Sequence, residues 1–187
     1  MLISWIVYGK IWGMIYFIRH GETDYNKAHR YQGQLDIPLN EVGISQAQKA
    51  RDEELGIRFD VIYSSPLSRA KKTAEIINEK HKAKFVLDDR LKEIYGGTSQ
   101  GECLDNWSDD EVKELYENPK KFGAESSAEL CRRVESFYKE IEDSDKNILI
   151  VSHGGVYRAI YRYLNNVDGY HFEMAGTKNA IFRKLKD

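Results

Sequence analysis

Residues 14–21 read Met-Ile-Tyr-Phe-Ile-Arg-His-Gly, and this stretch decides the fold. A short run of β-branched and aromatic residues that stops at a polar turn is typical of a buried strand ending in a loop. In open α/β sheets, ligands bind beyond the carboxyl ends of the strands. The sequence therefore predicts that Arg19 and His20 face a ligand, with Gly21 behind them where the backbone comes close to a neighbour.

A second apolar run, residues 147–151, ends in the same way and is followed by Ser152, His153 and two glycines. One histidine in such a place is more often structural than functional, but two in matching contexts reverse that preference. We expect His20 and His153 to face each other across one pocket.

The remaining apolar runs indicate the fold class. Strands are predicted at 14–18, 60–63, 84–87, 147–151 and 179–184, the last of them as an edge strand. Apolar residues at helical spacing predict helices within 44–55, 67–77, 130–141 and 156–164, and an acidic segment predicts a short helix within 105–117. Strands that alternate with helices indicate an α/β fold, here a three-layer sandwich with a mostly parallel central sheet flanked by helices.

Two helix starts carry recognisable caps. Ser126 and Glu129 have the spacing of a capping box for the helix within 130–141. Ser65 and Pro66 are predicted to open the helix within 67–77, with the serine as N-cap and the proline at the first helical position.

Composition limits the classes of protein. A chain of 187 residues with 41% hydrophobic and 31% charged residues is typical of a single soluble domain. The net charge of −2 offers no basic surface for nucleic acid. Cys103 and Cys131 have neither metal-ligand nor redox spacing, which favours reduced thiols and a cytoplasmic location.

The first residues are apolar, but they do not resemble a signal peptide or a membrane anchor. No basic region precedes them, Lys10 interrupts them, and the run is far shorter than the roughly 20 residues of a spanning helix. We expect residues 1–13 to be a non-catalytic N-terminal extension, residues 14–187 to form one domain, and no membrane to be involved.

The charged residues near the strand ends suggest phosphoryl chemistry. Arg69 falls in the first turn of a helix, where a cation opposes the helix dipole by about 0.3–1 kcal/mol unless an anion binds beside it. Planar guanidinium groups such as those of Arg19 and Arg69 match the equatorial oxygens of a transferring phosphoryl group. There is no Gly-rich P-loop and no acidic cluster for Mg²⁺, so a metal-free route with a neutral histidine nucleophile is favoured.

The leaving group also needs a proton donor. Residues 88–93, Asp-Asp-Arg-Leu-Lys-Glu, follow a predicted strand and contain three candidates, Asp88, Asp89 and Glu93. Residue chemistry alone does not choose among them.

Five segments follow one another in a characteristic order. They read Arg-His-Gly-Glu-Thr-Asp-Tyr-Asn at 19–26, Tyr-Gln-Gly-Gln-Leu-Asp-Ile-Pro-Leu-Asn at 31–40, Ser-Ser-Pro-Leu-Ser-Arg-Ala at 64–70, Asp-Arg-Leu-Lys-Glu at 89–93 and Val-Ser-His-Gly-Gly at 151–155. Together they resemble the motifs of the histidine phosphatase superfamily, in its phosphoglycerate-mutase-like branch of small phosphatases. The resemblance implies a phosphoglycerate-mutase-like fold.

The resemblance also implies residue roles. His20 would be the nucleophile that becomes phosphohistidine, and Glu93 the proton donor that later activates water. Arg19, Arg69 and His153 would form the phosphate pocket. Contacts with phosphate or substrate are implied for Asn26, Gln32, Gly33 and Gly154. No cofactor and no metal are implied.

Three functions remain open at this point. The first is a cofactor-independent phosphomonoesterase for a small phosphorylated metabolite, the second a phosphoglycerate mutase, and the third a catalytically silent binding module. Mutases of the family usually carry a longer, proline-rich insertion between the acid and the last histidine, whereas only Pro119 lies there, so hydrolysis is favoured. Residues 94–125 depart from the family pattern and are expected to form a lid, which leaves the substrate open. Monomer and homodimer are both possible.

Overall fold

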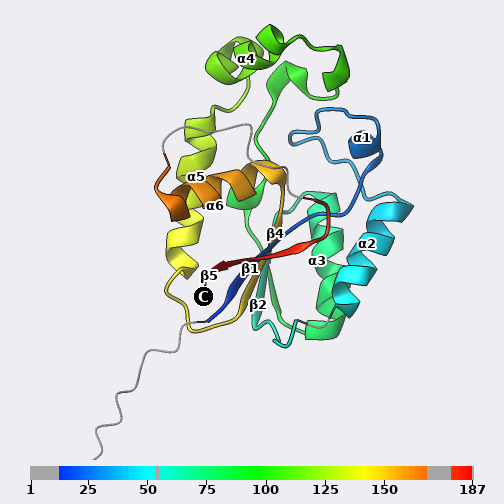
Figure 1. Cartoon of the computed structure of the whole chain (residues 1–187), viewed down its shortest axis with the longest axis vertical. Helices are drawn as coiled ribbons and strands as arrows, with labels where there is room; N and C mark the ends of the chain where they lie inside the picture. Colours follow the sequence, from blue (N-terminus) through cyan, green and yellow to red (C-terminus); the bar gives the residue numbers. More distant parts are fainter. Residues whose placement is uncertain (1–12, 54, 168–177, 187) are drawn as a thin grey trace, which may run out of the picture.

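The computed structural model describes residues 13–53, 55–167 and 178–186, and a five-stranded sheet lies at its centre (Figure 1). The strands are β1 (Ile15–Arg19), β2 (Val61–Ser64), β3 (Lys84–Leu87), β4 (Ile148–Ser152) and β5 (Phe182–Lys186). Their order is β3-β2-β4-β1-β5, with parallel pairing between all neighbours except β1 and β5, which are antiparallel. The mostly parallel sheet and the edge position of the last strand are thus confirmed.

Helices cover both faces of this sheet. They are α1 (Asp24–Lys27), α2 (Glu41–Asp52), α3 (Ser68–His81), α4 (Asp109–Glu117), α5 (Ser127–Ile141) and α6 (Gly154–Asn165), with short 3₁₀ helices η1 (Asp89–Leu91), η2 (Gly97–Ser99), η3 (Leu104–Asn106) and η4 (Pro119–Phe122). The pair α2 and α3 lies on one side of the sheet and the pair α5 and α6 on the other, while α4 stands above them (Figure 1). The three-layer α/β sandwich is confirmed.

Successive side chains of a strand point to opposite faces of the sheet, and a hydrophobic core lies on each face. Ile15 and Phe17 of β1 point into the cluster formed with α5 and α6, whereas Ile18 points into the cluster formed with α2 and α3. Because both faces are covered, the central strands β1 and β4 are apolar along nearly their whole length rather than alternating, and every residue of β4 is buried.

The last strand begins later than the predicted range of 179–184. Asn179 and Ala180 form a turn instead, and Ala180 has a φ of +50°. The Ala180 N–H donates to the carbonyl of Arg19 (2.9 Å), and the Asn179 side-chain amide donates to the carbonyl of His20 (2.8 Å). The turn therefore holds the carboxyl end of β1, which is the reason that these residues do not extend the strand.

The predicted start of the second helix is wrong. α3 begins at Ser68, and its N-cap residue Leu67 makes no side-chain cap hydrogen bond. The hydroxyl of Ser65 accepts a hydrogen bond from the Leu67 N–H (3.3 Å) and lies 2.8 Å from Nε2 of His153. Leu67 has an extended backbone (φ −61°, ψ 134°), so Pro66 and Leu67 remain outside the helix.

The capping box of α5 is confirmed. The Ser126 hydroxyl accepts from the Glu129 N–H, and the Glu129 carboxylate accepts from the Ser126 N–H.

We expect Ser126→Ala to lower the free energy of unfolding by about 1 kcal/mol, because one N–H group of the first turn loses its acceptor. Urea denaturation measures the change, and Ser127→Ala, which leaves the cap in place, serves as the matched control. Equal stability of Ser126→Ala and wild type would contradict the cap.

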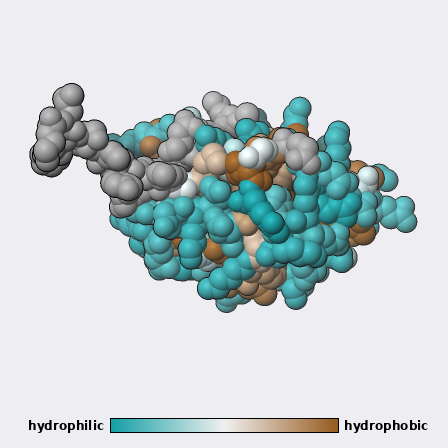
Figure 2. Space-filling view, turned by 90° about the horizontal axis from the view of Figure 1, so that it is seen from below, coloured by the Kyte–Doolittle hydropathy of each residue, from teal (hydrophilic) through white to brown (hydrophobic). Residues whose placement is uncertain are grey.

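The predicted extension over residues 1–13 lies, except for Gly13, outside the described residues. Among the helices that the structure describes, none is both long and apolar enough to cross a membrane. Viewed from below the sheet, most of the described surface is hydrophilic, and hydrophobic residues form separate patches (Figure 2).

Candidate active site

The site lies where β1 and β4 end side by side. Arg19 is paired with Ser152 in the sheet register, and the His20 N–H continues the ladder by donating to the carbonyl of Ser152 (3.0 Å). The residue that follows each strand is therefore a histidine, and the two histidines lie side by side at the carboxyl end of the sheet. The rings of His20 and His153 have centroids 5.2 Å apart, which confirms that the two histidines face each other.

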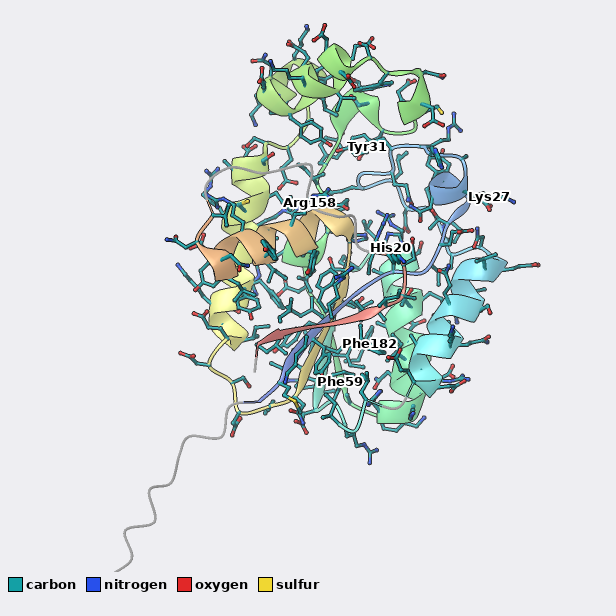
Figure 3. All side chains as sticks on the ribbon, viewed as in Figure 1. His20, Lys27, Tyr31, Phe59, Arg158 and Phe182 are labelled. Carbon is teal, nitrogen blue, oxygen red and sulfur yellow. The ribbon has the colours of Figure 1, made fainter. Side chains whose placement is uncertain are left out.

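A cavity of about 390 Å³ opens over these strand ends. Eight of the nine predicted site residues line it: Arg19, His20, Asn26, Gln32, Gly33, Arg69, Glu93 and Gly154. The ninth, His153, is fully buried beside His20. Figure 3 shows His20 at the upper end of the sheet, with Arg158 of α6 and Tyr31 above it.

The ring of His20 is held in one orientation and one tautomer. Its Nδ1 lies 2.7 Å from the carbonyl oxygen of Gly21, and because a carbonyl only accepts, Nδ1 must carry the proton. Burial lowers the pKa of His20 well below its usual value, and the positive charges of Arg19 and Arg69 lower it further. His20 is thus neutral at pH 7, with the lone pair on Nε2 available as a nucleophile.

Position 21 requires a glycine because the backbone of α2 passes close to it, as the sequence predicts. A Cβ atom built on Gly21 would lie 2.3 Å from the carbonyl oxygen of Gly43 in α2. The Gly21 N–H donates to the Thr73 hydroxyl (3.1 Å), and the Glu22 N–H donates to the side chain of Gln46 (2.9 Å). The loop that carries His20 is therefore fixed by both α2 and α3.

Arg69 is fully buried, in the first turn of α3, so a solvated surface arginine is excluded. Its two terminal nitrogens donate to the carbonyls of Leu35 (2.7 Å) and Gly33 (2.8 Å). Burial lowers its pKa to about 10, although Glu93 and Asp36 act in the opposite direction, and the guanidinium stays charged at pH 7. Nε of Arg69 is buried and makes no hydrogen bond with the described residues, so it can serve an anion.

His153 contributes a second buried imidazole. Its Nε2 lies 2.8 Å from the Ser65 hydroxyl, while its Nδ1 is buried without a hydrogen-bond partner in the described part of the chain. Burial lowers the pKa of His153 well below its usual value, and Arg69 and His20 add to this effect. Sequence reasoning assigned Ser65 to the helix cap and missed this contact, for which the sequence carries no signal.

The two buried histidines make stability depend on pH. Below about pH 6.5 the unfolded chain binds a proton at each of them and the folded chain does not, so the unfolded state is favoured. We expect the free energy of unfolding to fall between pH 7.0 and 5.5, by at most about 1.4 kcal/mol per pH unit for each histidine. Urea denaturation at both pH values measures the slope, which should be shallower in His153→Gln. An unchanged slope in that variant would contradict the expectation.

Of the three candidate proton donors Asp88, Asp89 and Glu93, the structure places Glu93 in the lining of the cavity. Its carboxylate accepts hydrogen bonds from the Ile94 N–H (2.9 Å) and from the Gly155 N–H at the start of α6 (3.1 Å). Asp88 and Asp89 instead form ion pairs with neighbouring cations. The geometry thus separates three carboxylates that residue chemistry alone left equivalent.

Asn26, Gln32 and Gly33 form the wall beside His20. The Thr23 hydroxyl lies within hydrogen-bond distance of Asn26 Oδ1 (3.1 Å) and Gln32 Oε1 (3.0 Å). Gly33 has a φ of +50°, in the left-handed region that favours glycine, and its carbonyl faces Arg69.

The outer wall of the cavity contains none of the nine predicted site residues, although Tyr25 and Tyr31 belong to the motif segments and Tyr116 to the expected lid. It consists of Tyr25, His29, Arg30, Tyr31, Asp105, Tyr116 and Arg158. These residues come from three separate segments, so no local pattern could have grouped them. Asp105 and Tyr116 belong to residues 94–125, which therefore overhang the site, whereas Trp107 and Phe122 of the same segment stack on each other (centroids 6.3 Å apart). No group of three or more potential metal-ligating side chains occurs among the described residues.

Comparisons with known proteins agree with this arrangement. The model of the histidine phosphatase superfamily (branch 1) matches residues 15–186. A putative phosphoserine phosphatase 2 from Hydrogenobacter thermophilus is 36% identical over 176 residues, covering 87% of this chain and 86% of the relative. A probable phosphoglycerate mutase GpmB from Escherichia fergusonii is 36% identical over 150 residues, covering 75% of this chain and 69% of the relative.

Among solved structures, the mycobacterial glucosyl-3-phosphoglycerate phosphatase in complex with VO3 is similar, with a TM-score of 0.71 and 26% sequence identity. The match covers 91% of this chain and 89% of that structure's chain. Fold, cavity and sequence agree, and the chain belongs to the histidine phosphatase superfamily.

Proposed function

We propose that this protein is a phosphomonoesterase that hydrolyses a small phosphorylated metabolite through a phosphohistidine at His20, without a cofactor. The proposal rests chiefly on the neutral imidazole of His20, which holds its proton on Nδ1 and lines one cavity together with the guanidinium groups of Arg19 and Arg69. Such a group can attack phosphorus while Arg19 and Arg69 neutralise the phosphoryl oxygens. The family match and the phosphatases among the relatives support the same conclusion.

The reaction has two balanced steps. In the first, Nε2 of His20 forms a bond to phosphorus, the bond to the ester oxygen breaks, and that oxygen leaves as an alcohol with the proton of Glu93. In the second, water gives a proton to Glu93 and attacks phosphorus, the P–N bond breaks, and phosphate leaves. His153 supports the phosphoryl oxygens in both steps. Asn26, Gln32, Gly33 and Gly154 contact the phosphate or the rest of the substrate.

A phosphoglycerate mutase is the second candidate, because several relatives are probable phosphoglycerate mutases. It would use the same first step and return the phosphoryl group to a hydroxyl of the substrate instead of to water. A silent binding module is disfavoured because all five residues proposed for catalysis are present at the site.

The test is release of inorganic phosphate from a panel of phosphomonoesters, including phosphoserine and 3-phosphoglycerate, with and without EDTA. We expect release that EDTA leaves unchanged. Interconversion of 2- and 3-phosphoglycerate without phosphate release would identify a mutase, and loss of activity in EDTA would contradict the metal-free route.

We further propose that residues 14–187 form one domain and that the protein is cytoplasmic. Cys103 and Cys131 are both free thiols, which fits a reducing compartment. Limited proteolysis should remove residues near the N-terminus and leave phosphatase activity intact, and light scattering will distinguish a monomer from a homodimer.

A further inference from the structure

Arg133 of α5 binds the segment that carries Glu93 more extensively than a structural ion pair requires. Its Nη1 donates to the carbonyls of Arg90 and Lys92 (both 2.7 Å), and its Nη2 donates to the carbonyl of Glu93 itself (3.0 Å). These carbonyls follow β3, outside any strand, and therefore lack ladder partners. One guanidinium thus satisfies three backbone groups around the proposed acid.

The guanidinium is itself fixed by Glu125 at the end of the 94–125 segment. Nε and Nη2 of Arg133 donate to the two carboxylate oxygens of Glu125 (2.7 and 2.8 Å), and both side chains are mostly buried. The same carboxylate accepts from the Tyr95 N–H (3.1 Å), two residues beyond Glu93. The pair therefore connects α5, the lid and the acid-bearing loop on both sides of Glu93.

The side chain of Glu93 is held at its other end, where the carboxylate accepts from the N–H groups of Ile94 and Gly155. The Glu93 carbonyl, which Arg133 binds, also accepts from the Gln34 side chain (2.9 Å). Because the side chain starts from this backbone, a shift of the backbone at residue 93 would move the carboxylate relative to His20. A misplacement of about 1 Å in a reacting group can cost about 100-fold in rate.

We propose that Arg133, fixed by Glu125, is a positioning residue that aims Glu93 at the leaving-group oxygen. The inference rests on the proposed function. It predicts that loss of Arg133 impairs protonation of the leaving group and leaves attack by His20 largely intact.

The test compares kcat/KM for an alkyl phosphate, whose leaving oxygen needs a proton, with that for 4-nitrophenyl phosphate, whose leaving group needs little protonation. We expect Arg133→Met to lose at least about tenfold more kcat/KM on the alkyl ester than on the nitrophenyl ester. Arg132→Met, an exposed arginine on the same helix, is the matched control and should leave the ratio of the two substrates unchanged.

Two further variants keep the test decisive if Arg133→Met folds poorly. Arg133→Lys retains the positive charge but cannot bind three carbonyls and a carboxylate together, so it should show the same selective loss. Because Arg133 also helps to lower the pKa of His153, full rescue by lysine would mean that its charge matters rather than its hydrogen bonds. Glu125→Gln should show the selective loss in a weaker form.

A double-mutant cycle tests whether Arg133 acts on the reaction through Glu93. In a Glu93→Gln background, Arg133→Met should no longer change the ratio of the two substrates, because the group that it positions is already inactive. Equal losses on both esters, or the same selective loss in the Glu93→Gln background, would overturn the inference and leave the phosphatase intact. Absence of turnover of either ester by wild type would overturn the proposed function, and the inference with it.

Discussion

His20→Ala is expected to lower kcat/KM for every phosphomonoester by about 10⁴-fold or more, because the proposed first step forms a bond between its Nε2 and phosphorus. Among the described residues, the ring is held by one hydrogen bond, from Nδ1 to the carbonyl of Gly21, and its neighbourhood is fixed by backbone contacts with α2 and α3. We therefore expect the variant to fold as wild type does. Phosphate release and circular dichroism measure the two effects separately.

A matched control is available in a second buried histidine. His81 lies at the end of α3, where its ring packs against Phe59 (centroids 4.7 Å apart), and Phe59 lies well below His20 in Figure 3. His81→Gln removes a buried imidazole without touching the cavity, so phosphatase activity should persist. Normal turnover by His20→Ala, or an equal loss in both variants, would refute the assignment of the nucleophile.

Glu93→Gln has the second-largest expected effect, and it depends on the substrate. An amide cannot donate an acidic proton, so kcat/KM for an alkyl phosphate should fall by about 10²–10⁴-fold. For 4-nitrophenyl phosphate the first step should be nearly unaffected. Activation of water also fails in the variant, so nitrophenol should appear as a burst followed by slow turnover.

Asp88→Asn is the control for this experiment, because Asp88 lies in the same segment but pairs with Arg90 (2.7 Å) rather than lining the cavity. Its kinetics on both esters should match those of wild type. Equal losses on the two esters in Glu93→Gln would contradict its role as acid.

The elements that the sequence predicts well are those that bury continuous apolar runs. β1 and β4 are apolar on both faces because helices cover the whole sheet, so their ends, and the histidines that follow, could be located within about one residue. The glycine at position 21 could likewise be explained in advance, because close backbone approach is a local requirement.

Contacts between distant segments could not be predicted in this way. Ser65 has the local chemistry of a helix cap, and only the position of His153 beside it gives it another partner. Arg133 has the spacing of a surface residue on an amphipathic helix, yet it binds carbonyls some forty positions earlier in the chain. Such roles are decided by tertiary packing, which a periodic pattern does not encode.

A covalent phosphoryl group on His20 can be trapped and located directly. Glu93→Gln enzyme is mixed with a labelled phosphomonoester, quenched in alkali within the nitrophenol burst, and mapped by mass spectrometry, because a P–N bond survives alkali and is cleaved by acid. We expect one phosphoryl group per burst equivalent on His20, lost on acid treatment and absent when His20 is alanine. A burst without label on His20, or label on another residue, would contradict it.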